Sequence, residues 1–192
     1  ESRNLADGLE ILSTMINDKD CLKFLSFVAA ITSTGLRGII ADMLKKKMFD
    51  VVITTCGALD HDIARYFSNY LEGSFTLDDA ELLEKNIHRL GNVLVPMESY
   101  GPIIEEKMQM FLEAAYKSGK KEMSTADITR MIGENLGDGS FLYWAYKNNI
   151  PVIVPGIVDG AVGSQIWLFT QKHKDFKLNV IADSELLSSL VF

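Results

Sequence analysis

Cysteine is scarce in this sequence, which argues against two common ways of stabilising or equipping a small protein. Cys21 and Cys56 are its two cysteines, and their separation fits neither a zinc site nor a disulfide framework. Apolar runs are short as well, because none reaches the roughly 18 residues that a membrane span requires. The first residues also lack the pattern of a signal peptide. The sequence therefore predicts a cytoplasmic protein of a reducing environment, with no membrane partner.

Positive charge is also in short supply. Asp and Glu number 26 against 19 Lys and Arg residues, so the formal net charge is −7. A protein that binds a phosphate backbone needs a basic face. The charge balance therefore predicts that no nucleic acid is bound.

Several catalytic signatures are missing too. The sequence contains no G-x-G-x-x-G fingerprint, P-loop, H-E-x-x-H, G-x-S-x-G or C-x-x-C motif. Without them, the usual kinase, hydrolase and zinc-enzyme interpretations lose their support. Any dinucleotide site would have to be built from turns of another kind.

The length and apolar content are sufficient for one domain with a substantial core, at 192 residues and 47% hydrophobic residues. The sequence begins at Glu1 without an initiator methionine and ends on the apolar residues Leu190, Val191 and Phe192. We therefore predict a single α/β domain over residues 1–192 that belongs to a longer protein and is incomplete at both ends.

Short apolar strands alternate with amphipathic helices along the chain. Strands are predicted at 24–31, 51–54, 151–156 and 178–181. Helices are predicted at 5–16, 36–44, 59–70, 78–86, 103–117, 125–136, 141–147 and 165–171, with another start at Asp183. Ser124 and Asp127 form a capping-box pattern before the helix at 125. Apart from the helix at 78–86, residues 71–101 are predicted to be irregular. The alternation predicts an α/β fold with a parallel sheet and helices on both of its faces.

Small and hydroxylated residues follow three of these strands, at 32–35, 54–57 and 156–164. In open α/β sheets, ligands bind beyond the carboxyl ends of the strands. Small residues allow a close approach to the backbone, and helix N-termini favour phosphate. Thr, Ser and Gly also cap helices and form turns without any ligand. Because three such turns would meet at one sheet edge, we favour a pocket of dinucleotide size.

Three titratable residues lie at these strand ends. Asp60 and His61 begin a helix after the second strand, where they could bind a ligand or serve as a helix cap and a structural histidine. Asp159 stands between Val158 and Gly160, where an unpartnered carboxylate would be costly to desolvate. Such a carboxylate suits a bidentate contact to a ribose diol.

Three segments then resemble deoxyhypusine synthase in its archaeal form. They are TTCGALDHD at 54–62, RLGNVLVP at 89–96 and PGIVDGAVG at 155–163. The resemblance continues in the same order from about Asn4 to the last residue. It implies a Rossmann-like NAD enzyme that works as a homotetramer with sites between paired subunits. Members of the family oxidise spermidine with NAD and move its aminobutyl group, through an imine on an enzyme lysine, to one lysine of the hypusine-containing translation initiation factor.

The resemblance also implies which residues contact ligands. The implied cofactor contacts are Ala29, Ala30, Ile31, Thr32, Ser33, Thr55, Cys56, Gly57, His61 and Asp159. The implied polyamine contacts are Asp60, His61 and Ser164. No catalytic residue and no metal ligand is expected in this chain, because the nucleophilic lysine of the family belongs to a segment expected beyond Phe192. We therefore expect residues 1–192 alone to be inactive.

The sequence departs from the eukaryotic members at three of these positions. Ala30 replaces an asparagine, His61 an acid and Ser164 a polyamine-binding aspartate, so polyamine specificity stays open. Two other hypotheses also stay open. The protein could be a homospermidine synthase-like paralogue that uses a free diamine as acceptor, or a non-catalytic partner subunit of such an enzyme.

Overall fold

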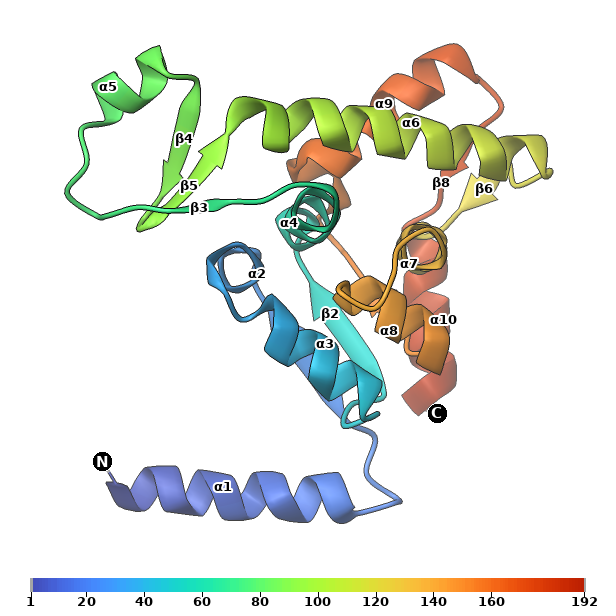
Figure 1. Ribbon diagram of the computed structural model, residues 1–192. Coiled ribbons are helices and arrows are strands. Elements are labelled where there is room, and N and C mark those ends of the chain that lie inside the picture. Colours follow the sequence, from blue (N-terminus) through green and yellow to red (C-terminus); the bar gives the residue numbers. More distant parts are fainter. Residues whose placement is uncertain (1, 192) are drawn as a thin grey trace.

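The computed structural model describes residues 2–191, and its central sheet has three parallel strands. The strands are β1 (Phe24–Phe27), β2 (Val51–Thr54) and β7 (Val152–Ile153), in the order β1-β2-β7. Leu25 is paired with Val52, which is paired in turn with Val152. The predicted α/β class with a parallel sheet is confirmed, and β2 has the predicted bounds (Figure 1).

The two faces of this sheet are covered to different extents. Val52 and Val152 lie in the main hydrophobic core. Helices α3 (Arg37–Lys45) and α8 (Phe141–Asn148) pack against one another there. On the opposite face, Val51 and Ile153 are buried, but Phe24 on the edge strand is 40% exposed. Helices and loops thus cover both faces at the centre of the sheet but leave part of β1 accessible.

Helices make up most of the rest of the chain. Their bounds are α1 Ser2–Asn17, α2 Ala30–Thr34, α3 Arg37–Lys45, α4 Cys56–Phe67, α5 Asp79–Glu84, α6 Gly101–Lys117, α7 Thr125–Glu134, α8 Phe141–Asn148, α9 Ala161–Lys172 and α10 Ile181–Val191, with 3₁₀ turns η1 Met97–Ser99 and η2 Ile157–Asp159. The capping box of α7 is present, since Ser124 Oγ accepts from the Asp127 amide and the Asp127 carboxylate accepts from the Ser124 amide. Every predicted helix is recovered, although α4 and α9 begin three or four residues early.

Three strand predictions are corrected. The strand predicted at 151–156 is reduced to β7, since Pro155 and Gly156 belong to the turn that leads into η2. The strand predicted at 24–31 ends at Phe27, because residues 30–34 form α2. The hydroxyls of Thr32 and Thr34 donate to carbonyls of the same turn, and such local bonds compete with a sheet ladder. The strand predicted at 178–181 is β8 (Lys177–Leu178), which pairs with β6 (Glu122–Met123) in a separate sheet instead of joining the central one.

The prediction that residues 71–101 are irregular outside one helix is wrong. They contain a three-stranded antiparallel sheet of β3 (Leu71–Glu72), β4 (Ile87–Leu90) and β5 (Val93–Pro96). Gly91 and Asn92 connect β4 to β5, and Gly91 has φ 63°, as the first position of a two-residue hairpin loop requires. This sheet extends away from the central one beside α6, on the side where α2 lies (Figure 1).

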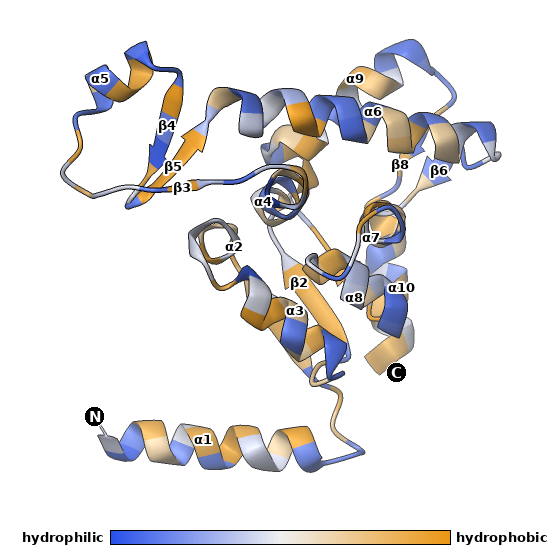
Figure 2. Cartoon of the chain, in the orientation of Figure 1, coloured by the Kyte–Doolittle hydropathy of each residue, from blue (hydrophilic) through white to orange (hydrophobic). Residues whose placement is uncertain are grey.

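Helix α1 stands apart from the rest of the chain (Figure 1) and none of its residues is buried. Its apolar and polar residues alternate along the helix in Figure 2, and Leu5, Leu9 and Ile11 are each more than half exposed. Within residues 2–191, no helix combines the length and apolarity that crossing a membrane would demand.

Candidate functional site

The three predicted turns meet at one edge of the central sheet. The Ala29 amide donates to Thr55 Oγ1 over 3.1 Å, which joins the first turn to the second. The amides of Ala161 and Val162 donate to the Asp60 carboxylate over 2.9 and 2.8 Å, which joins the third turn to the second. Parallel pairing explains this, since the carboxyl ends of β1, β2 and β7 must lie side by side.

Much of the first turn faces inward. Thr32 is fully buried, and its hydroxyl donates to the Ala29 carbonyl over 2.6 Å. The Ser33 hydroxyl donates to the Ala30 carbonyl, and Arg65 Nη1 donates to the Thr32 carbonyl at the end of α2. Ala29, Ala30 and Ser33 still border a cavity, whereas Ile31 packs against the core.

The small residues of the second turn serve close packing. A Cβ on Gly57 would lie 2.8 Å from Ala29 Cβ, so a larger residue would separate α4 from α2. Cys56 is fully buried, and burial next to Asp60 raises the pKa of its thiol to about 12. A neutral thiol at this position acts as a small apolar side chain.

The Asp60 side chain holds the third turn in place. Its carboxylate is 1% exposed and accepts from the Ala161 and Val162 amides and from Tyr100 Oη at 2.8 Å. Burial raises the pKa of Asp60, while these three donors partly offset the increase. The two amides belong to the first turn of α9, where the helix dipole favours negative charge. In this structure both carboxylate oxygens are already occupied by protein donors.

Asp159 and Ser164 are both exposed. The Ser164 hydroxyl donates to the Gly160 carbonyl over 3.1 Å within α9. The expectation that Asp159 would be desolvated beside Val158 is wrong, because Val158 itself is 75% exposed. Within residues 2–191, the Asp159 side chain accepts no hydrogen bond, so its carboxylate is available to a ligand.

A groove lies between these turns and the antiparallel sheet. Its two cavities have volumes of about 420 and 460 Å³, and His61 and Leu90 border both. The first is completed by His88, Arg89, Val95 and Tyr100, and the second by Ala29, Ala30, Ser33, Thr34, Phe75, Gly91 and Asn92. An adjoining cavity of about 270 Å³ shares Ser33, Thr34 and Asn92 and adds Arg65, Tyr70 and Glu72 among its lining residues.

His61 is the predicted site residue at the centre of this groove. Its Nδ1 lies 2.8 Å from Tyr70 Oη, and its ring also contacts Tyr100, with ring centroids 5.4 Å apart. Burial, and secondarily the charge of Arg65, lower the pKa of His61 to about 4. His61 is therefore neutral at physiological pH.

This pKa predicts a pH effect on stability. Because the pKa of folded His61 is below its ordinary value of 6.5, the unfolded chain takes up the proton first, and stability falls from pH 6.5 to about 4. At ~1.36 kcal/mol per unit the shift corresponds to ~3 kcal/mol, which partial solvent access reduces to about 1–2 kcal/mol. Urea unfolding at pH 7 and 4.5 should show a smaller drop in the His61→Gln variant. Other titrating groups, Asp60 included, are common to both proteins, so equal drops would contradict the assignment.

Sequence reasoning missed half of the groove. Tyr70, Phe75, Leu90, Gly91, Asn92 and Tyr100 were not among the predicted site residues. Two of them, Gly91 and Asn92, lie in the RLGNVLVP segment, so the motif was visible but its position opposite the strand ends was not. Asn92 offers a side-chain amide that, in the described part of the chain, has no hydrogen-bond partner.

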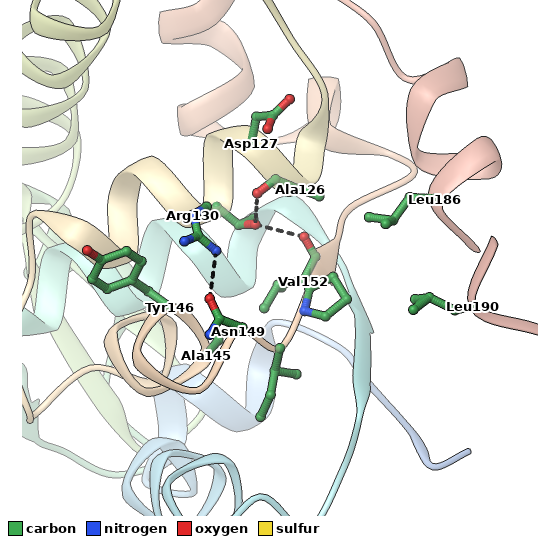
Figure 3. A pocket seen from close by; sticks show the side chains of 12 residues that line it. Ala126, Asp127, Arg130, Ala145, Tyr146, Asn149, Val152, Leu186 and Leu190 are labelled. Atoms are coloured by element: carbon green, nitrogen blue, oxygen red, sulfur yellow. Dashed lines mark hydrogen bonds between the residues drawn. The ribbon is translucent and has the colours of Figure 1, made fainter. Parts of the chain in front are cut away.

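A further cavity, of about 290 Å³, lies between α7, α8, β7 and α10 (Figure 3). Arg130 Nη1 donates to Asn149 Oδ1 over 3.2 Å on one side, and Leu186 and Leu190 of α10 face it from the other. Pro151 at the amino end of β7 also borders it. It contains none of the predicted site residues and is separate from the edge where the three turns meet.

The fold and the groove together define the structural class of the protein. The chain is a Rossmann-like α/β protein whose strand ends converge beside a groove, and no group of three potential metal ligands occurs within residues 2–191. The family model described as deoxyhypusine synthase matches residues 1–192. The chain belongs to the deoxyhypusine synthase family, as its sequence segments predicted.

Individual relatives agree with this family. The chain is 53% identical over 189 residues to a probable deoxyhypusine synthase of Thermoplasma volcanium, covering 98% of this chain and 60% of the relative. It is 48% identical over 192 residues to one of Picrophilus torridus, covering 100% and 61%. A provisionally named deoxyhypusine synthase of Entamoeba histolytica, known from a crystal structure, has the same fold, with TM-score 0.73, 22% identity and coverage of 98% and 65%. The chain thus spans about 60% of the length of the curated relatives it matches.

Proposed function

We propose that the complete protein is a deoxyhypusine synthase that uses NAD to transfer the aminobutyl group of spermidine to one lysine of the hypusine-containing translation factor. The observation that carries the proposal is the match of the family along the whole chain, RLGNVLVP and DGAVG segments included. The convergence of the three turns beside a groove supports the cofactor part of it. We further propose a cytoplasmic homotetramer, with residues 1–192 as its NAD-binding portion.

The residues of the groove fit a dinucleotide. Ala29 and Ala30 leave room at the start of α2, and the ring of Phe75 and the aliphatic side chain of Leu90 provide apolar walls. Asn92 and His61 present polar groups to the same cavity. Bound NAD would supply the hydride acceptor for the polyamine. The protein's part would be to hold the dinucleotide with these residues and with Asp159, whose free carboxylate suits a ribose diol.

The polyamine and acceptor parts of the proposal rest on fewer residues. Ser164 is exposed near the third turn, whereas Asp60 would have to exchange a protein donor for a polyamine ammonium. The nucleophilic lysine is proposed to lie outside residues 1–192. The homospermidine-forming paralogue and the non-catalytic partner subunit are the alternatives.

One experiment separates these alternatives. The full-length protein is incubated with NAD and radiolabelled spermidine, and either the translation factor or putrescine is added as acceptor. Label in the factor supports the proposal, and label in homospermidine supports the paralogue. Activity that appears only after mixing with a second homologous chain would identify a partner subunit.

Asp159→Asn should weaken NAD binding by about ten- to a hundredfold. Charge-assisted bonds to a carboxylate are worth ~1.5–3 kcal/mol each, and ~1.4 kcal/mol corresponds to a factor of ten. Unfolding should hardly change, because the side chain is exposed and has no protein partner within residues 2–191. Calorimetric titration of NAD measures the effect, with Asp138→Asn as control, since Asp138 is an exposed carboxylate in another loop. Equal NAD affinities of the two variants would show that Asp159 does not contact NAD and only forms part of the turn.

A further inference from the structure

The contact between His61 and Tyr70 bears on which nitrogen of the imidazole carries the proton. His61 Nδ1 and Tyr70 Oη are 2.8 Å apart, so one of the two must donate. If the imidazole donated from Nδ1, the phenol proton would need another acceptor, and within residues 2–191 Tyr70 Oη has no second hydrogen-bond partner. If Tyr70 donates, the phenol proton and Nδ1 are both paired, and only the imidazole N–H at Nε2 is left for the groove. This pairing favours donation by the hydroxyl to Nδ1.

The ionisation of both groups is compatible with this assignment. Burial raises the pKa of Tyr70, so the phenol keeps its proton, and burial keeps His61 neutral. A neutral imidazole that accepts at Nδ1 carries its proton on Nε2. Nε2 is on the opposite side of the ring from Tyr70, and no described residue bonds to it. It is the nitrogen left for the groove that His61 borders.

The surroundings favour a ligand atom that accepts this proton. Neither of the two cavities beside His61 is lined by an Asp or Glu side chain, whereas Arg89 lines one of them. Arg65, on the same helix as His61, adds positive charge near the ring. An ammonium group here would meet an N–H donor and positive charge, because Glu72 lines the adjoining cavity but not the two that His61 borders. A hydroxyl, carbonyl or phosphate oxygen would find a donor.

We propose that Tyr70 is a positioning residue that holds the proton of His61 on Nε2, so that His61 donates to an oxygen acceptor of the ligand and does not receive an ammonium group. The proposal rests on the proposed function, because it names which ligand part meets His61. Of the two contacts implied for His61, it selects the dinucleotide over the polyamine.

The tautomer is measured first and needs no ligand. In protein labelled with ¹⁵N-histidine, the three histidines are His61, His88 and His173, and the His61 signals are assigned by their loss in His61→Gln. At pH 7, His61 should show a protonated Nε2 and an unprotonated, hydrogen-bonded Nδ1. In Tyr70→Phe the two tautomers should mix. A proton on Nδ1 in the wild type overturns the proposal, whatever the enzyme does.

NAD titration then tests the consequence. Tyr70→Phe should weaken NAD binding about fivefold. Tyr66→Phe, on the same helix as His61, should not, since no hydrogen bond joins the Tyr66 hydroxyl to a described residue. In the His61→Gln background, Tyr70→Phe should add less than a twofold loss, because the two residues act as a pair. Equal losses with and without His61 would overturn the positioning role. Absence of NAD binding by the wild type would instead contradict the proposed function and leave the tautomer result standing.

Discussion

Gly163→Ala should destabilise the protein by about 4 kcal/mol or prevent its folding. A Cβ at position 163 would collide with the carbonyl oxygen of Ile157 and lie 2.7 Å from the Cα of Val158. Both are backbone atoms of η2, so no side-chain rotation relieves the contact. Overpacking of a core typically costs ~1–3 kcal/mol, and a collision with backbone exceeds that range. Urea unfolding of the purified variant measures the loss, and circular dichroism shows whether the variant folds.

Gly38→Ala is the matched control. Gly38 also lies in the first turn of a helix, α3, but nothing is within 4 Å of the position of its missing Cβ. The same substitution should therefore stabilise by about 0.5–1 kcal/mol, since alanine costs less backbone entropy than glycine in a helix. If both variants lost the same free energy of unfolding, close packing of α9 against η2 would not be the reason that position 163 requires glycine.

Glycines in the third turn can have two explanations: they can admit a ligand, or they can allow the protein's own chain to pack closely. The sequence favoured small residues that let a ligand approach the backbone. In the structure, a Cβ on Gly160 would meet Asp60 Oδ2 and Cys56 Sγ at 2.7 Å, and Gly163 lies against η2. The protein's own chain thus occupies the space that these glycines leave. The side chains that remain for a ligand at this turn are those of the exposed residues Asp159 and Ser164.

Elements with strong local signals were predictable. Val51 to Thr54 is a run of apolar β-branched residues that ends in threonine, and the strand has these bounds. The capping box at Ser124 and Asp127 fixes the start of α7 through bonds that four consecutive residues make by themselves. The parallel direction of β1, β2 and β7 was predictable as well, because the strands alternate with helices along the chain, whereas their order in the sheet was not predicted.

The antiparallel sheet was missed because its signal is short. Gly91 and Asn92 between Leu90 and Val93 form a two-residue hairpin signal, but the flanking strands have four residues each and β3 has two. Its location opposite α2 is a tertiary arrangement between segments distant in sequence, in which Gly91 and Asn92 line one cavity with Ala29 and Ala30. Half of the groove is built from this sheet, so the strand ends were predicted while the opposite wall was not.

The bonding partners of Asp60 could not be predicted from the sequence either. A first-turn acid was expected to face either a ligand or the dipole of its own helix, α4. It bonds instead to the first turn of α9, about a hundred residues later in the chain, at Ala161 and Val162. Nothing in the local pattern distinguishes a carboxylate that caps its own helix from one that caps another.

Asp60→Asn should lower the free energy of unfolding by about 2–3 kcal/mol. The amide oxygen can replace one carboxylate oxygen, but the NH₂ group must then face a donor, because Val162 donates to Oδ1 while Ala161 and Tyr100 donate to Oδ2. A buried donor without a partner costs ~1–3 kcal/mol, and charge-assisted bonds are lost as well. Burial raises the pKa of Asp60, so the neutral amide recovers some desolvation energy and keeps the loss below the ~3–5 kcal/mol typical of a broken buried ion pair.

Thermal unfolding at neutral pH measures this loss, and at ~2–4 °C per kcal/mol for a chain of this size the melting temperature should fall by roughly 5–10 °C. Tyr100→Phe is the control, because it removes one donor and leaves both α9 amides on the carboxylate. It should cost about 1 kcal/mol, the usual net value of one hydrogen bond. If Asp60→Asn cost no more than Tyr100→Phe, the α9 amides would not depend on the charge of Asp60. Its carboxylate would then be free to meet a ligand, as the sequence first indicated.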